Sequence, residues 1–255
     1  MKSFAKINIF LKITGLRGNY HELASRFVLL EDIYDEIEFI KTNDKFANLQ
    51  ICTNKEIKGK NIIQKAYDKL CEFGFENELK EFFSSHFINL KKQIPMGGGL
   101  GGGSSNAATF LQMLNKELNL KISKENLMQI GAKIGADVPF FLSGFKSANV
   151  AGIGEKITEF DDEVPNFKLS LKNISCDTAK VYDEFRANFL KFDIKFANLL
   201  LNLKSSEILS QFKNYELNDL LRPCQNLYPN LQICDDEFLS GSGSTCFKVK
   251  NERVS

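Results

Sequence analysis

Histidine and paired cysteine are nearly absent from this chain. Only two of its 255 residues are histidine, His21 and His86, which argues against a histidine-rich metal centre. No two cysteines form a C-x-x-C pair, which excludes the usual spacing of zinc sites and redox dithiols. We therefore expect free thiols, buried as small hydrophobic side chains in a reducing cytoplasm. The cysteines are Cys52, Cys71, Cys176, Cys224, Cys234 and Cys246.

Long apolar runs and a surplus of one charge are missing too. No run of roughly 18 apolar residues occurs, so we expect no membrane span. The 33 basic residues nearly balance the 32 acidic ones, which argues against a protein that coats nucleic acid. The N-terminal residues enter an alternating strand pattern at once and do not form a signal peptide. These absences predict a cytoplasmic protein without a nucleic-acid or membrane partner.

Glycine, in contrast, is concentrated in one short loop. Residues 95–108 read Pro-Met-Gly-Gly-Gly-Leu-Gly-Gly-Gly-Ser-Ser-Asn-Ala-Ala, and six of them are glycine. Each glycine loses extra conformational freedom on folding, so such a loop is costly unless backbone N–H groups must approach a ligand. Ser104 and Ser105 then open a helical pattern, and the N–H groups and dipole of a helix N-terminus favour an anion. We interpret the loop as a cradle for a polyphosphate.

Three other interpretations of this loop are weaker. A flexible linker lacks flanking order, whereas Ile94-Pro95 precedes this loop and an amphipathic helix pattern follows it. Gly97, Gly99 and Gly102 match the dinucleotide pattern G-x-G-x-x-G, but they stand in mid-chain behind a proline. A nicotinamide oxidoreductase is therefore a distant alternative, which binding of NADH would test. A Walker A loop is excluded because no Lys-Ser or Lys-Thr follows the glycines.

Hydrophobic periodicity predicts both strands and helices in the first part of the chain. Residues 4–13 alternate between apolar and polar side chains, which predicts a strand with one buried face. Ser123 is the expected N-cap of a helix that runs towards Ile134. The other expected elements are a turn at 15–18, strands at 27–30, 36–40 and 87–92, and helices at 61–73 and 104–118.

The pattern restarts past residue 145. Strands are expected at 168–174 and 245–250, and helices at 178–189, 192–203 and 216–234, the last interrupted at Pro223 and Pro229. This mixture predicts the α+β class, with two lobes and a cleft between them. We expect residues 1–147 to form the lobe with the glycine loop and residues 148–255 to form the C-terminal lobe.

Two charged residues and a second glycine-rich stretch are candidates for chemistry. Lys6 lies beside Asn8 on the polar face of the first strand, where a lysine is usually only solvated. Asp137 precedes Val-Pro-Phe-Phe and is either a turn or cap residue, or a carboxylate whose charge state burial and a lysine would set. Residues 239–247, Leu-Ser-Gly-Ser-Gly-Ser-Thr-Cys-Phe, form either a hairpin loop or a second backbone contact for an anion.

Together these segments resemble the GHMP kinase family, which includes galactokinase, homoserine kinase and mevalonate kinase. Ala5-Lys6-Ile7-Asn8 is similar to the family's early strand with a basic residue and asparagine. Residues 95–108 resemble its Pro-x-x-x-Gly-Leu-Gly-Ser-Ser loop, and residues 240–246 its late glycine-rich loop. A narrower resemblance, to one branch of the family, rests on the stretches 5–11, 18–23 and 135–139. Phe4 stands where the family often has proline, and the C-terminal lobe is expected to be shortened at its end.

The resemblance implies a two-lobed kinase that uses ATP and Mg²⁺, with its active site in the cleft. It implies that Asp137 is the general base for a substrate hydroxyl, and that Lys6 beside it favours the ionised carboxylate. It assigns no residue as a ligand of the metal. The implied ATP-binding residues are Asn61, Lys92, Pro95, Met96, Gly97, Gly98, Gly99, Leu100, Gly101, Gly102, Gly103, Ser104 and Ser105.

The narrower resemblance implies a small-molecule acceptor, a cytidine diphosphate polyol with a tertiary hydroxyl. Tyr20 and Tyr182 would clamp the cytosine ring, and His21 would recognise its edge. There are two alternatives. One is another GHMP kinase that acts on mevalonate or homoserine, and the other is a family member that binds ATP without catalysis. A monomer or weak homodimer is expected. The implied substrate-binding residues are Asn8, Tyr20, His21, Thr178, Tyr182, Gly241, Ser242 and Gly243.

Overall fold

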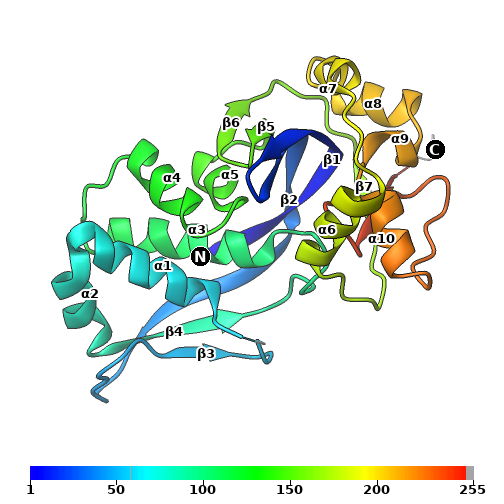
Figure 1. The fold of residues 1–255 in the computed structure, drawn as a ribbon. Coiled ribbons are helices and arrows are strands. Elements are labelled where there is room, and N and C mark those ends of the chain that lie inside the picture. Colours follow the sequence, from blue (N-terminus) through cyan, green and yellow to red (C-terminus); the bar gives the residue numbers. More distant parts are fainter. Residues whose placement is uncertain (58, 251–255) are drawn as a thin grey trace, which may run out of the picture. The chain divides into compact units, whose positions relative to one another are not determined.

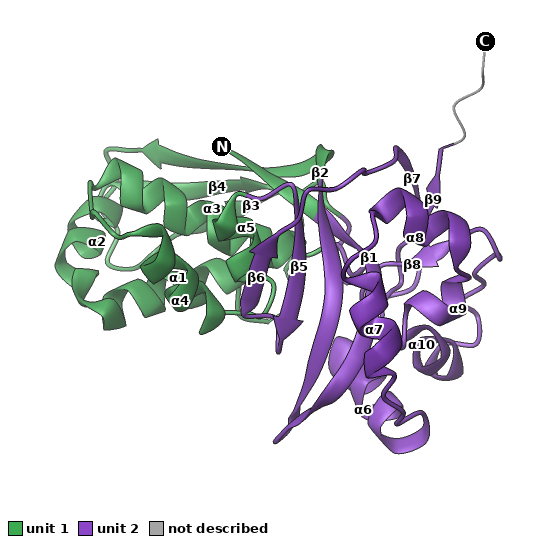
Figure 2. Cartoon of the chain, turned by 90° about the horizontal axis from the view of Figure 1, so that it is seen from above, with its two compact units in different colours: residues 1–5, 30–94, 101–144 green, residues 6–29, 95–100, 145–255 purple. Residues whose placement is uncertain are grey.

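Strands and helices follow one another in mixed order along the chain, which confirms the predicted α+β class (Figure 1). The computed structural model describes residues 1–57 and 59–250. The chain divides into two compact units, each assembled from separate segments (Figure 2). Unit 1 contains residues 1–5, 30–94 and 101–144, and unit 2 contains residues 6–29, 95–100 and the described residues from 145 onwards. The lobe boundary expected at residue 147 stays a prediction.

The chain begins with two long paired strands, β1 (Lys2–Arg17) and β2 (Tyr20–Lys41). Strand structure continues through Arg17 and the turn lies at residues 18–19, so the turn expected at 15–18 was placed too early. The two strands expected at 27–30 and 36–40 are one continuous strand. Glu31 and Asp32, which separate the apolar stretches, are exposed on β2 and do not interrupt its backbone.

Both faces of β1 are buried, so the prediction of a single buried face is wrong. The side chains of Lys6, Asn8 and Lys12 belong to the polar set of the alternating pattern, yet they are 3%, 1% and 6% exposed. Polar groups can be buried at low cost when they find hydrogen-bond partners. Lys12 Nζ, for example, forms an ion pair with Asp219 and donates to Glu216 O at 2.8 Å.

In unit 1, the second half of β2 pairs with β4 and extends a small sheet. β4 (His86–Lys91) runs antiparallel to β2, with Glu36 opposite Lys91 and Ile40 opposite Phe87. β3 (Ile51–Thr53) runs parallel to β4 at the edge. The strand expected at 87–92 is therefore confirmed, shifted by one residue.

Helices cover one face of this sheet in unit 1 (Figure 1). Ile37 and Ile88 of the strands share one hydrophobic core with Phe110 and Leu111 of the helix at residues 102–117, all of them fully buried. This core joins sheet and helices into one packed body. The helices are α1 (Ile62–Leu70), α2 (Glu76–Phe83), α3 (Gly102–Glu117), α4 (Lys124–Ala132) and α5 (Val138–Ser143).

The helix boundaries in unit 1 refine the sequence prediction. The helix expected at 61–73 is α1, with Asn61 as its N-cap, but a π-helical segment (Cys71–Phe75) replaces its end. Gly74 has φ 104°, which no α-helical residue adopts, so the helix cannot continue through it. Ser123 caps α4 as predicted, since its hydroxyl accepts a hydrogen bond from Asn126 N at 3.2 Å.

In unit 2, the first half of β2 pairs with a different strand. β5 (Ser147–Gly152) is antiparallel to it, with Ser25 opposite Val150, and β6 (Lys156–Glu159) pairs with β5. A second, three-stranded antiparallel sheet has the order β7-β9-β8. Its strands are β7 (Phe167–Ser170), β8 (Phe238–Leu239) and β9 (Cys246–Val249), so the strands expected at 168–174 and 245–250 are both shorter than predicted.

The helices of unit 2 depart furthest from the prediction. α6 (Thr178–Asn188) and α7 (Ile194–Leu200) are confirmed, but α8 (Ser205–Gln211) was not predicted. The helix expected at 216–234 is wrong, because two short helices, α9 (Asn214–Leu217) and α10 (Leu221–Leu227), occupy this region.

The break between α9 and α10 is caused by Asn218 and not by a proline. Asn218 Oδ1 accepts a hydrogen bond from Leu220 N at 2.9 Å, which offers the backbone an alternative to the helix. Pro223 is the third residue of α10, in its first turn, where the missing N–H has no intrahelical partner to lose. Asparagine is therefore the stronger signal for the chain break here.

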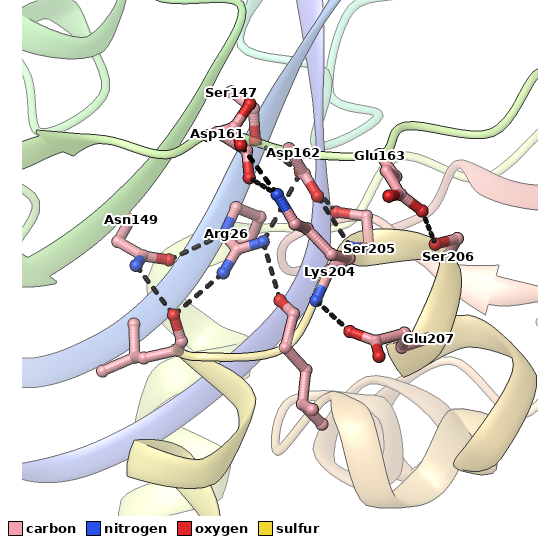
Figure 3. Close-up of polar contacts among 12 residues, drawn as sticks. Arg26, Ser147, Asn149, Asp161, Asp162, Glu163, Lys204, Ser205, Ser206 and Glu207 are labelled. Atoms are coloured by element: carbon pink, nitrogen blue, oxygen red, sulfur yellow. Dashed lines mark hydrogen bonds and ion pairs between the residues drawn. The ribbon is translucent and has the colours of Figure 1, made fainter.

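A buried arginine ties α7 and α8 to the strands of unit 2 (Figure 3). Arg26 on β2 is fully buried, donates to Asn149 Oδ1 at 2.6 Å and pairs with Asp162 at 3.4 Å. Two hydroxyls, Ser147 Oγ and Ser205 Oγ, donate to Asp162 Oδ2 at 2.6 Å. The guanidinium also donates to the carbonyls of Leu201 and Leu203, in the chain that joins the two helices.

The six cysteines are all free, as expected, but only half of them are buried. Cys52 and Cys234 are exposed, so the prediction of six buried thiols is wrong for them, and Cys71 is half-buried. Cysteine tolerates exposure without a partner, so composition alone does not reveal which thiols are interior. Among the helices of the described residues, none has the length and apolar character needed to cross a bilayer.

Candidate active site

The glycine loop of residues 97–100 lies against the second glycine-rich stretch within unit 2. Thr245 N donates to Gly98 O at 3.2 Å, and Ser240 Oγ donates to Gly99 O at 3.1 Å. Lys6 N donates to Leu100 O at 3.0 Å, which ties the first strand to the same loop. Segments far apart in the sequence thus meet here through their backbones.

Gly99 is required by the closeness of this contact. A Cβ atom on Gly99 would lie 2.2 Å from Ser240 O and 3.2 Å from Gly243 O, both of them backbone atoms that cannot rotate away. Its φ of 74° is also one that other residues rarely adopt. Both the space and the backbone angle therefore exclude a side chain at this position.

The ammonium group of Lys6 is buried beside this pair of loops. Its Nζ donates to Asn8 Oδ1 at 2.7 Å and lies 4.5 Å from the ring centroid of Phe27. Asn8 Nδ2 donates in turn to Ser25 Oγ at 3.0 Å. The strand alternation that suggested a solvated lysine instead produces a cation held in a low-dielectric environment.

The second glycine loop brings further predicted substrate residues to the same region of unit 2. A Cβ on Gly241 would lie 3.4 Å from Asn8 Oδ1, so this glycine is a direct neighbour of the Lys6–Asn8 pair. Thr178, at the start of α6, and Ser242 share a hydrogen bond of 2.8 Å between their hydroxyls. The structure therefore gathers Asn8, Thr178, Gly241 and Ser242 in one region of unit 2, and their binding of a common ligand stays a prediction.

Unit 1 carries the other half of the glycine run at the start of α3. Gly101 is the N-cap of α3, with φ 68°, and residues 102–104 form the first helical turn. In any α-helix the N–H groups of this turn have no intrahelical partner and attract an anion. The helix begins two residues earlier than predicted, so Gly102 and Gly103 belong to the helix and not to the loop.

The first turn of α3 has two neighbours in unit 1 that the sequence had singled out. A Cβ on Gly103 would lie 3.6 Å from Ile62, the residue next to the N-cap Asn61. A Cβ on Gly135 would lie 3.7 Å from Ser104 Oγ. The start of α1 and the turn that leads to Asp137 thus both flank the proposed phosphate-binding helix.

Asp137 occupies the N-cap position of α5, but it does not act as a cap. Its carboxylate makes no capping hydrogen bond to the helix, and the turn is closed instead by Val138 N, which donates to Gly135 O at 3.1 Å. The side chain is half-buried. The structure therefore does not support a cap, but Asp137 does lie in a turn before Pro139, as the other part of that alternative predicted.

A buried polar network in unit 1 anchors the entry to the glycine loop, and Asp35 is its centre. Asp35, fully buried on β2, accepts hydrogen bonds from Gln93 N at 2.7 Å and Ile94 N at 2.8 Å, just before the loop. It forms an ion pair with Lys92 and accepts from Asn106 Nδ2 at 2.9 Å. Asp35 was not predicted from the sequence, because it is one of several acids along a strand.

Two residues predicted to bind ATP are part of this network. Lys92 is 4% exposed, and its Nζ contacts Asp35 and Asn106. The Ser105 hydroxyl is buried and accepts a hydrogen bond from Ser3 Oγ at 2.8 Å. Their side chains hold the loop and the helix in place, and a direct contact of either with ATP stays a prediction.

His21, Tyr182 and Phe185 form an aromatic cluster in unit 2. The rings of His21 and Tyr182 have centroids 4.9 Å apart, and Phe185 packs edge-on to His21 at 6.0 Å. His21 Nε2 is buried, and it is one of two buried side-chain polar atoms without a hydrogen-bond partner among the described residues. Buried polar groups are nearly always paired, so this nitrogen indicates a ligand that would complete the cluster.

Arg186 is a residue of this cluster that the sequence did not suggest. Its Nη2 donates to Gly18 O, in the turn before Tyr20 and His21, at 3.3 Å, and its Nε is the second unpartnered buried atom. Burial, and then the charge of Arg186, lower the pKa of His21 from its usual 6.5. His21 is therefore neutral at pH 7.

Two predicted binding residues are largely exposed. The side chain of Tyr20 is 64% exposed and that of Met96 is 50% exposed. Tyr20 is the first residue of β2 and Met96 lies in a turn, both in unit 2, and their binding roles stay predictions.

Comparisons of the sequence and the fold with known proteins identify the family of this chain. Residues 61–145 match the family model "GHMP kinases N terminal domain". The chain is 48% identical over 255 residues to the 4-diphosphocytidyl-2-C-methyl-D-erythritol kinase of Campylobacter jejuni subsp. jejuni (strain 81-176), and the match covers 98% of this chain and 99% of the relative. The chain belongs to the GHMP kinase family. Within it, the similarity is to the 4-diphosphocytidyl-2-C-methyl-D-erythritol kinases.

Solved structures of GHMP kinases have the same fold. A crystal structure of 4-(cytidine 5'-diphospho)-2C-methyl-D-erythritol kinase matches with a TM-score of 0.73 and 25% identity, over 98% of this chain and 89% of that chain. The Methanococcus jannaschii mevalonate kinase matches with a TM-score of 0.62 at 13% identity, over 98% of this chain and 90% of that chain. The second match shows the fold alone. The GHMP kinase fold predicted from the sequence is thus confirmed.

Gly99→Ala tests the contact between the two glycine loops. We expect the variant to lose at least about 2 kcal/mol of unfolding free energy, because a Cβ would collide with backbone atoms and the residue has a positive φ. Urea unfolding followed by circular dichroism measures this loss.

Gly103→Ala is the matched control for the glycine run. Its Cβ would meet only Ile62, at an ordinary contact distance of 3.6 Å, and alanine favours a helix. We expect its stability to equal or exceed that of the wild type. Equal losses in both variants would show that the glycine run is merely sensitive to any side chain.

Proposed function

We propose that this protein transfers the γ-phosphoryl group of ATP to the 2-hydroxyl of 4-diphosphocytidyl-2-C-methyl-D-erythritol, a step of non-mevalonate isoprenoid biosynthesis. The observation that carries the proposal is the meeting of the two glycine-rich loops and the Lys6–Asn8 pair within unit 2. The identity to kinases of that name supports the choice of acceptor. The unsatisfied His21 nitrogen in an aromatic cluster supports a nucleobase.

ATP would bind through backbone groups more than through side chains. The N–H groups of the loop and of the first turn of α3 would hold the phosphates, assisted by the helix dipole. Asn61, beside that turn, would line the adenine end. A tight backbone cradle needs positive φ angles, and Gly97, Gly99 and Gly101 all have them.

Mg²⁺ would accompany the nucleotide. Among the described residues, no three His, Cys, Asp or Glu side chains gather to hold a metal ion. Magnesium at such sites takes most of its oxygen ligands from phosphates and water, so one or two protein oxygens suffice. Ser104 Oγ, in the first turn of α3, is a protein oxygen that fits. When bound, the ion would neutralise charge on the phosphate oxygens.

Catalysis would rest on positioning and on one proton transfer. We propose that Asp137 accepts the proton of the acceptor hydroxyl as that oxygen attacks the γ-phosphorus. The Asp137 carboxylate makes no capping hydrogen bond to α5, which is consistent with this role. Lys6 would stabilise the negative charge on the attacking oxygen, and burial would strengthen this interaction because the surroundings do not screen it.

The cytidine end would bind at the His21 cluster. Neutral imidazole both donates and accepts a hydrogen bond, and the edge of cytosine offers both kinds of partner. Tyr182 already lies against His21, and Tyr20 would close over the base. Thr178 and Ser242, joined by their hydroxyls, would contact the diphosphate or the polyol. The protein would work in the cytoplasm, where its thiols stay reduced, as a monomer or weak homodimer.

An acceptor panel tests the proposed reaction. The pure protein, ATP and Mg²⁺ are incubated in turn with 4-diphosphocytidyl-2-C-methylerythritol, mevalonate and homoserine, and ADP formation is measured together with the phosphorylated product. We expect turnover and a 2-phosphate with the first acceptor only. Turnover with mevalonate or homoserine instead would favour another GHMP activity, and ATP binding without turnover a non-catalytic role.

Asp137→Asn tests the general base. The variant keeps the size of the side chain but cannot accept the proton, so we expect kcat to fall by about 10³-fold or more with ATP affinity unchanged. Asp236→Asn, which removes an exposed carboxylate paired with Lys248, is the control and should keep full activity. If Asp137→Asn fails to fold, the result would favour the interpretation of Asp137 as a turn or cap residue.

The acceptor KM is expected to depend on pH through His21. Because burial and Arg186 lower the pKa of His21, the imidazole stays neutral until the pH falls below 6.5. Protonation below that point removes the acceptor nitrogen and adds a charge, so the KM of the cytidine substrate rises at acid pH while the KM of ATP does not. His21→Gln, which cannot titrate, should flatten this profile; the same acid rise in that variant would assign it to another group.

A further inference from the structure

Ser25 is fully buried on β2, and its hydroxyl is the far end of the hydrogen-bond chain that reaches Lys6. Ser25 Oγ donates to the backbone carbonyl of Phe10 on β1. A serine hydroxyl has a single proton, and a carbonyl can only accept, so the remaining role of Oγ is that of an acceptor. The Asn8 amide therefore turns its NH₂ group towards Ser25.

The direction of the amide decides what Lys6 meets. With Nδ2 bound to Ser25 at 3.0 Å, Asn8 Oδ1 faces the ammonium and accepts its hydrogen bond at 2.7 Å. The three side chains are each at most 3% exposed, so water cannot replace any of these bonds. The Phe10 carbonyl, by accepting the Ser25 hydroxyl proton, thus sets the donor-to-acceptor direction of the hydrogen bonds between Ser25, Asn8 and Lys6.

We propose that Ser25 is a positioning residue of the kinase: it holds the Asn8 amide in the orientation that fixes the ammonium group of Lys6 for phosphoryl transfer. This inference rests on the proposed function for its kinetic consequence. Without Oγ, Asn8 Nδ2 becomes a buried donor with no partner, and the side chain rotates to find one. The Asn8 oxygen that accepts the hydrogen bond from Lys6 Nζ is then no longer held in one place, although neither Lys6 nor Asn8 has been substituted.

Ser25→Ala is the direct test. We expect kcat with 4-diphosphocytidyl-2-C-methylerythritol to fall by roughly 10- to 100-fold, since a displacement of about 1 Å at a reacting group has that effect. The KM of ATP should not change, because Ser25 makes no contact with the glycine loop in the structure's hydrogen-bond pattern. Ser25→Thr, which keeps the hydroxyl, should recover most of the lost kcat.

Ser147→Ala is the matched control. Ser147 is a buried strand serine on β5, opposite Val28 of the same strand β2, and its hydroxyl donates to Asp162 far along the chain from Lys6. The variant loses one buried hydroxyl of the same kind. We expect it to lose some stability and to keep its kcat. Equal losses of kcat in both variants would reduce Ser25 to a structural role and overturn the proposal.

A double-mutant cycle separates positioning from general destabilisation. If Ser25 acts only through Asn8, then Ser25→Ala should have almost no further effect on kcat in the Asn8→Ala background. Effects that multiply instead would contradict the inference, even if Ser25→Ala alone lowers kcat.

A readout without turnover distinguishes this inference from the proposed function. If the wild-type protein does not phosphorylate the acceptor, the proposed function is refuted. The side-chain amide of Asn8 can still be followed by ¹H–¹⁵N NMR in that case. Its signal is assigned as the one that disappears in the Asn8→Asp variant. We expect slow exchange of its protons with water in the wild type and faster exchange in Ser25→Ala. An unchanged Asn8 signal would overturn the proposal whatever the activity.

Discussion

The contact between Gly99 and the carbonyls of Ser240 and Gly243 is the constraint on which the rest of unit 2 depends. Two backbones approach here more closely than any side chain would permit. The Ser240 hydroxyl strengthens the contact, since it donates a hydrogen bond to Gly99 O at 3.1 Å. Lys6 is tied to the same place, since its backbone N–H donates to the neighbouring Leu100. One set of close backbone contacts thus holds together the two glycine loops and the strand that carries Lys6.

Around this contact, the polar residues of the first strands are buried in fixed chains of hydrogen bonds. Lys6, Asn8 and Ser25 form one such chain in unit 2, and Asp35 with Lys92 and Asn106 another in unit 1. A buried charge is costly unless each of its hydrogen-bonding groups is satisfied, so these residues have little freedom to move. That rigidity suits phosphoryl transfer, which depends mostly on the position of charges. His21 Nε2 and Arg186 Nε are the two exceptions among the described residues, since both are buried without a hydrogen-bond partner.

The sequence predicted the segments that meet at the candidate site, and less of the framework around them. The glycine run, the early Ala-Lys-Ile-Asn and the late Gly-Ser-Gly stretch were recognisable because their composition is unusual and local. Asp35, Ser25 and Arg186 were not, because an acid, a serine on a strand and an arginine on a helix are ordinary residues until their partners are known. The helix boundaries failed where a local side-chain bond, as at Asn218, competes with the helix backbone. Whether Lys6 and Asp137 act as the predicted pair stays a prediction.

By itself, the sequence determined the α+β class, the family and the position of the glycine loops. These depend on composition, on periodicity and on short motifs, all of which are properties of neighbouring residues. The tertiary structure alone decided that both faces of β1 are buried, that Lys92 and Ser105 are held in a polar network, and that a hydroxyl on β2 orients the amide beside Lys6. The reason is that burial and hydrogen-bond direction depend on partners from distant segments, and alternation along one strand says which side a residue faces but not what it meets there.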